Sequence, residues 1–122
     1  MRRLAWVPAL FLFAGALVLR AQEYRASVLG TVTDPANASI PGAAVVITNN
    51  QTGVANRTQT NAEGAFRIPY LLPGVYTLEV THPGFKSYRR GPIELHVDDR
   101  AKLDVALEIG RATEQVTVTA EA

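Results

Sequence analysis

The sequence predicts an all-β fold, an antiparallel β-sandwich of about seven to eight strands, preceded by a signal peptide. Short segments with alternating or β-branched apolar residues are separated by turn clusters at intervals of roughly eight to twelve residues, as in sandwiches. No segment has the periodicity of a helix. A chain of 122 residues, 48% hydrophobic and 19% charged, has the composition of one folded domain with a single core.

Residues 1–21 have the pattern of a secretory signal peptide. Arg2 and Arg3 form a basic start, an apolar stretch follows, and a small residue ends the segment. The apolar stretch contains Pro8 and Gly15, and it is shorter than the ~20 residues that a membrane-spanning helix needs. We therefore expect cleavage before Gln22 and an exported mature protein with no transmembrane segment.

Removal of residues 1–21 changes the electrostatic balance of the chain. Three arginines leave with the signal, so 9 basic residues remain against 11 acidic ones and the net charge becomes −2. A protein of this charge has no basic stripe of the kind that nucleic acids require, and we expect no nucleic-acid partner. The absence of cysteine excludes disulfides, thiolate nucleophiles and zinc–thiolate sites.

The first half of the mature chain contains three expected strands. In 25–33, Val28, Gly30 and Val32 lie on one face by the two-residue period of a strand. Segment 43–48 is apolar and β-branched on both faces, which favours a central position covered on both faces. Segment 54–60 is polar and is therefore expected at a sheet edge.

Two strands with clear inward faces follow. In 65–69, Phe66 and Ile68 point inward, and the proline at the end of this segment fits only the end of a strand. Segment 75–81 alternates most regularly, with Tyr76, Leu78 and Val80 on one side. We expect these residues in the core.

Three further strands complete the expected sandwich. Segments 85–90 and 93–97 are separated by a Gly-Pro turn, and the second of them has Ile93, Leu95 and Val97 in phase. The last strand, 101–109, has apolar residues at every second position from residue 103 onward. The sandwich domain is thus expected to span 22–110, and 111–122 has the character of a linker.

Five short motifs resemble, in order and spacing, those of the carboxypeptidase regulatory-like domain, a transthyretin-like or starch-binding-like β-sandwich. They are Gly-Thr-Val-Thr-Asp at 30–34, Ile-Pro-Gly-Ala-Ala-Val at 40–45, Asn-Ala-Glu-Gly-Ala-Phe at 61–66, Leu-Pro-Gly-Val-Tyr-Thr-Leu at 72–78 and Pro-Gly-Phe-Lys at 83–86. The match spans roughly 27–109. The resemblance implies that Tyr76, next to a turn, is a core residue and a hydrogen-bond anchor.

A domain of this type followed by Glu-x-Val-x-Val-Thr-Ala, here 114–120, resembles the start of bacterial TonB-dependent outer-membrane receptors. The resemblance implies that Glu114, Val116 and Val118 belong to a TonB-box-like strand that pairs with TonB by β-augmentation. The alternatives are an extra strand of the sandwich or a linker. A plug and barrel are expected downstream, so the printed chain is a fragment, a truncated reading frame or a stand-alone module.

The residues indicate no catalytic site, cofactor or metal site. His82 and His96 have no glutamate at ligand spacing, and no serine lies in a nucleophile motif. The sequence therefore favours a non-catalytic accessory domain of an exported protein, in the periplasm or outer membrane, or secreted.

A carbohydrate-binding module is the alternative function, because the starch-binding-like resemblance makes a polysaccharide partner plausible. Sugar recognition needs exposed aromatic rings, and the candidates are Tyr24, Tyr70, Phe85 and Tyr88. A stand-alone adhesive or spacer domain at the cell surface is a further alternative that the residues do not separate from the first.

Overall fold

The computed structural model describes residues 25–119, which form nine β-strands and no helix. The strands are β1 (Ala26–Thr33), β2 (Ala44–Asn49), β3 (Ala55–Gln59), β4 (Ala65–Leu71), β5 (Gly74–Thr81), β6 (Ser87–Leu95), β7 (Arg100–Lys102), β8 (Val105–Ala106) and β9 (Gln115–Thr119). The expected signal peptide lies outside the described residues. Within the described part of the chain there is no helix long and apolar enough to cross a membrane.

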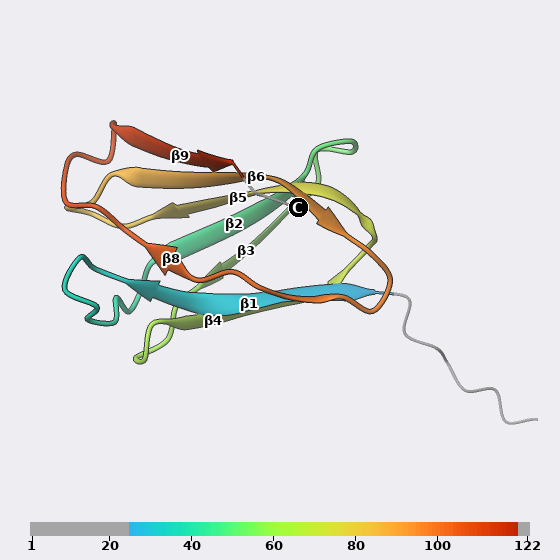
Figure 1. Ribbon diagram of the computed structural model, residues 1–122, viewed down its shortest axis with the longest axis horizontal. Helices are drawn as coiled ribbons and strands as arrows, with labels where there is room; N and C mark the ends of the chain where they lie inside the picture. Colours follow the sequence, from blue (N-terminus) through green and yellow to red (C-terminus); the bar gives the residue numbers. More distant parts are fainter. Residues whose placement is uncertain (1–24, 120–122) are drawn as a thin grey trace, which may run out of the picture.

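The strands form two layers, which confirms the predicted all-β sandwich (Figure 1). The larger sheet has the order β3-β2-β5-β6-β9. The smaller sheet has the order β4-β1-β7, with β8 pairing the far end of β1. The predicted inner position of β2 and edge position of β3 are confirmed, but β2 is buried on one face only and half-buried on the other.

The sheets are mixed, whereas the sequence predicted an antiparallel sandwich. Three pairings are parallel: β1 with β7, β1 with β8, and β6 with β9. All three involve the last third of the chain, which returns along β1 after β6 and then crosses to the other sheet. Local periodicity identifies a strand but does not specify its distant partner, so the direction of these pairings was outside what the pattern shows.

The expected strand 101–109 is divided into β7 and β8. The backbone N–H of Leu103 donates to Leu29 O (2.7 Å) and that of Leu107 to Thr33 O (2.8 Å), so this stretch follows β1 closely. Leu103 and Leu107 are buried as expected, but Ile109, which follows β8 and forms an isolated bridge with Phe85, is 71% exposed.

The expected turn at Gly91-Pro92 is also wrong, since both residues lie inside β6. The pairing of β5 with β6 shifts register between Tyr76 and Leu78, and this irregularity accommodates the two residues within the strand. Val97, expected to face the core, is exposed because β6 ends at Leu95 and the chain turns there.

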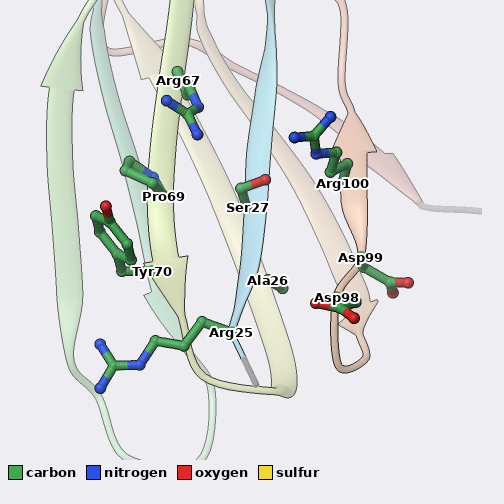
Figure 2. Close-up of a pocket in the computed structure, with 9 residues that line it drawn as sticks. All are labelled: Arg25, Ala26, Ser27, Arg67, Pro69, Tyr70, Asp98, Asp99 and Arg100. Atoms are coloured by element: carbon green, nitrogen blue, oxygen red, sulfur yellow. The ribbon is translucent and has the colours of Figure 1, made fainter. Parts of the chain in front are cut away.

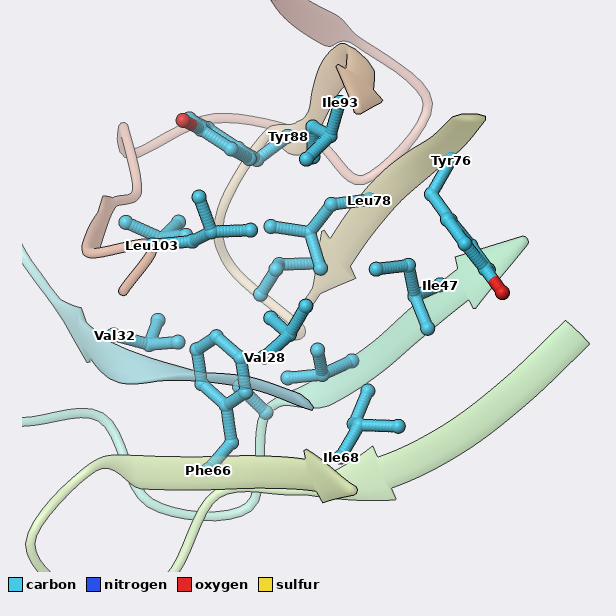
Figure 3. Packing of buried hydrophobic residues seen from close by; sticks show 14 of the residues in the cluster. Val28, Val32, Ile47, Phe66, Ile68, Tyr76, Leu78, Tyr88, Ile93 and Leu103 are labelled. Atoms are coloured by element: carbon cyan, nitrogen blue, oxygen red, sulfur yellow. The ribbon is translucent and has the colours of Figure 1, made fainter. Parts of the chain in front are cut away.

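The core lies between the two layers and consists of inward residues from both (Figure 3). The predicted inward residues of the first strands are confirmed as buried: Val28, Gly30, Val32, Phe66, Ile68, Tyr76, Leu78 and Val80. Tyr76 is 3% exposed and its hydroxyl donates to Leu72 O at 2.7 Å. The sequence expectation of a buried tyrosine anchored near a turn is therefore confirmed.

Candidate functional site

The segment at the end of the described chain is a strand of the sandwich. β9 lies parallel to β6, with Val116 opposite Tyr88 and Val118 opposite Arg90. Val116 and Val118 are half-buried, and Val118 packs against the core, while the intervening threonine is exposed. Of the alternatives weighed from the sequence, the structure has the extra strand, and the linker interpretation is wrong for these residues.

The start of β9 is held by several hydrogen bonds. Ser87 N–H donates to Glu114 O (2.8 Å) and the Ser87 hydroxyl donates to Ala112 O (2.8 Å). A Glu114 carboxylate oxygen accepts from the Arg111 N–H at 2.9 Å. Glu114 is thus part of the turn that positions β9. Within the described residues β9 is the outermost strand of its sheet, so its second edge carries backbone groups that face away from β6.

The four aromatic candidates for sugar stacking lie in different environments. Tyr88 is 7% exposed and belongs to the core, so it was wrongly expected to offer a stacking surface. Phe85 is half-buried and contacts the ring of His82 edge-on, with 5.7 Å between the ring centroids. Tyr24 lies outside the described residues. Tyr70, by contrast, is 67% exposed.

A β-bulge accounts for the exposure of Tyr70. Ala26 pairs with Leu71 and Val28 with Ile68, so a two-residue step on β1 opposes a three-residue step on β4. Tyr70 has a φ of 63°, in the left-handed region that bulky residues rarely occupy. The extra residue lets Ile68 and Leu71 both remain buried while the tyrosine ring turns outward.

Three arginines, which the sequence interpretation did not single out, surround the same surface as Tyr70. A cavity of about 240 Å³ is lined by Arg25, Arg67 and Arg100 together with Tyr70, and Figure 2 shows these side chains around the start of β1. They come from positions far apart in the sequence. No local motif signals the cluster, because only the register of β4, β1 and β7 brings them together.

The described residues include no group of three or more His, Asp or Glu side chains that could hold a metal ion. His96 lies 3.2 Å from a Glu94 carboxylate oxygen, and both side chains are largely exposed. His82 Nδ1 lies 3.0 Å from the carbonyl oxygen of Pro83, so this histidine interacts with its own turn.

The family of the chain follows from the sequence of the sandwich. Residues 27–108 match the model of the carboxypeptidase regulatory-like domain. The chain belongs to this family. The matched segment begins in β1 and ends just after β8, so it covers the sandwich up to the turn before β9.

A relative of known class shares this region. The chain is 36% identical over 83 residues to the TonB-dependent transporter Oar of Myxococcus xanthus. The aligned region is 66% of this chain but 8% of the transporter, so the chain spans a small part of that relative.

Solved structures share the fold at low sequence identity. The major pilin subunit BcpA of Bacillus cereus superposes with a TM-score of 0.55 at 17% identity, covering 70% of this chain and 30% of the pilin. Hydroxyquinol 1,2-dioxygenase from Pseudomonas putida superposes with a TM-score of 0.55 at 10% identity, covering 79% of this chain and 65% of the enzyme. At such identities the likeness shows the sandwich fold alone.

Proposed function

We propose that this chain is a non-catalytic accessory domain of an exported TonB-dependent outer-membrane receptor and forms the N-terminal periplasmic module of that receptor. The observation that carries the proposal is the 36% identity with a TonB-dependent transporter across the sandwich. The signal-like segment 1–21 supports export, and it would place the domain ahead of a plug and barrel in one polypeptide.

The role within the receptor that fits the geometry is docking through β9. An added strand needs backbone N–H and C=O groups along an open edge, and the outer edge of β9 has them in the described chain. Val116 and Val118 are half-buried and Val118 packs against the core, so a strand that pairs at the open edge leaves this packing intact. In this proposal the periplasmic domain of TonB binds that edge, and the sandwich presents it in a fixed orientation.

The first test is the DNA that follows the last codon. We expect an in-frame plug domain and a membrane barrel encoded after Ala122. A stop codon at that point in the native gene, with no receptor-type sequence after it, would remove the main support for an accessory role.

The second test measures binding to the periplasmic domain of TonB by isothermal titration calorimetry. The full chain and a peptide of segment 114–120 are each expected to bind, whereas a peptide with the same residues in scrambled order is not. If neither the chain nor the native peptide binds, docking through β9 is wrong. The receptor assignment is judged separately by the DNA.

A further inference from the structure

We propose that the outer face of the smaller sheet binds an acidic polysaccharide, with Arg67 and Arg100 holding a sugar carboxylate and Tyr70 stacking on a sugar ring. The proposal does not depend on the receptor assignment. It concerns the surface formed by β4, β1 and β7, on the opposite side of the molecule's core from β9 (Figures 1 and 2).

The basic side chains are brought together by strand register. Leu29 of β1 pairs with Arg67 on one side and with Lys102 on the other, and Ser27 pairs with Arg100. Lys102 has a carboxylate neighbour, Asp104, at 3.8 Å. Arg67 and Arg100 are exposed and form no ion pair among residues 25–119. Like charges on one face repel each other, and a bound anion would relieve that repulsion.

The acidic residues near the cluster restrict where an anion can lie. Asp98 and Asp99 border the cavity on the Arg100 side, and a carboxylate oxygen of Asp99 accepts from the His96 N–H at 2.7 Å. Figure 2 shows both aspartates on the side away from Tyr70. The favourable position for an anion is therefore the area above Ser27, between Arg67 and Arg100 and on the side away from the two aspartates.

Tyr70 provides a second and independent indication of a ligand. A bulky residue at φ 63° costs backbone energy, and such strain is concentrated at binding sites. Here the bulge directs the ring outward onto the same face as Arg67. An aromatic ring is suited to the apolar C–H face of a pyranose, which a simple anion does not possess.

The shape of the surface favours a polymer over a small ion. The cavity at Arg67 and Tyr70 adjoins one of about 290 Å³ that reaches Lys102, since both are lined by Ser27, Arg67 and Arg100. On the other side it adjoins a further cavity of about 290 Å³, reaching the exposed Leu72, with which it shares Tyr70. The first two hollows lie along the outer face of the smaller sheet, and the third continues past Tyr70 to the end of the sandwich, where Asn49, Thr52 and Val54 line it. A peptide recognised by strand addition would need a sheet edge instead.

The test is affinity electrophoresis of the full chain in native gels that contain polygalacturonate, dextran or polyglutamate. We expect retardation by polygalacturonate, none by dextran, and weaker retardation at higher salt because exposed charges are screened. Arg67→Gln is expected to weaken the apparent affinity about tenfold, the effect of losing one charge-assisted contact. Tyr70→Asn removes the ring but keeps a residue that tolerates positive φ, and should weaken binding about fivefold or more.

Arg57→Gln is the matched control, because Arg57 is an exposed arginine on β3 of the other sheet and its loss changes the net charge equally. It should bind like the unmodified chain. The proposal is overturned if polygalacturonate causes no retardation, or if Arg57→Gln and Arg67→Gln weaken binding equally. Equal retardation by polyglutamate together with full binding by Tyr70→Asn would indicate charge attraction alone and would also overturn it. Thermal unfolding followed by circular dichroism verifies that each variant is folded.

Discussion

At the scale of single residues, Thr60 is a buried polar side chain that joins two parts of the chain. It is 5% exposed, its hydroxyl donates to Ile40 O (2.6 Å), and it accepts from the Ala43 N–H (2.8 Å). The two partners lie on opposite sides of the Pro-Gly turn that leads into β2, Ile40 before it and Ala43 after it. Thr60 was expected from the sequence only as the end of a polar edge strand, because its two partners become visible only in the folded chain.

Replacing Thr60 by valine keeps the shape of the side chain but removes both hydrogen bonds. The Ala43 N–H is then buried without a partner, and we expect a loss of about 1–3 kcal/mol in the free energy of unfolding. Urea denaturation of the variant measures this loss. Thr60→Ser keeps the hydroxyl and should lose less, so equal losses for the two variants would contradict the hydrogen-bond explanation.

Gly30 is required by a close approach between backbones. A Cβ added there would overlap the carbonyl oxygen of Leu103, where the chain after β7 runs against β1. We expect Gly30→Ala to destabilise the fold by more than about 3 kcal/mol, since backbone on both sides must move. Gly42→Ala is the comparison, because φ there is 73° but the space is open, and about 1 kcal/mol is expected. Thermal unfolding that ranks the two variants in the opposite order would contradict this reading of Gly30.

At the scale of elements, the sequence predicted strands better than their boundaries and partners. Alternation identified β5 and the inward face of β1, because each places one apolar face against the core over its whole length. It failed where a strand departs from strict alternation. The bulge at Tyr70 and the register shift that keeps Pro92 inside β6 depend on the opposing strand, which local sequence does not describe.

The two candidate surfaces also differ in whether local sequence is enough to identify them. The segment containing Val116 and Val118 was found because seven consecutive residues, 114–120, are β-prone and resemble a motif of TonB-dependent receptors. The Arg67–Arg100 cluster was missed because its members are separated by more than a strand in sequence and meet only through pairing with β1.

Removing residues 115–122 tests whether the sandwich folds without β9 and whether β9 protects β6 from solvent. The truncated chain should remain folded, because the buried core is formed mostly by the other strands, but β6 becomes an open edge. We expect amide hydrogens in residues 87–91 to exchange faster with solvent while those of β5 keep their protection. Unchanged exchange in β6, measured by NMR or mass spectrometry, would mean that β9 is not stably paired in solution.

At the scale of the whole molecule, stability rests on one layer of side chains between two sheets. Leu78 lies at the centre of this layer with 0% exposure, so Leu78→Ala should cost about 2–5 kcal/mol in the free energy of unfolding. Val97→Ala removes apolar atoms from a side chain that is 52% exposed and is expected to stay within about 0.5 kcal/mol of the unmodified chain. Similar midpoints for the two variants in urea would contradict this description of the core.

The directions of the first and last strands have a mechanical consequence. The chain enters β1 from the end of the sandwich toward which β9 runs (Figure 1). A force that draws the two ends of the fold apart therefore acts largely across the strands, and it opens the contact between β9 and β6 one residue at a time, beginning at Thr119. We expect β9 to yield first under tension, because it is paired on one side only in the described sheet whereas β1 is paired on both, and the rest of the sandwich to bear load after that.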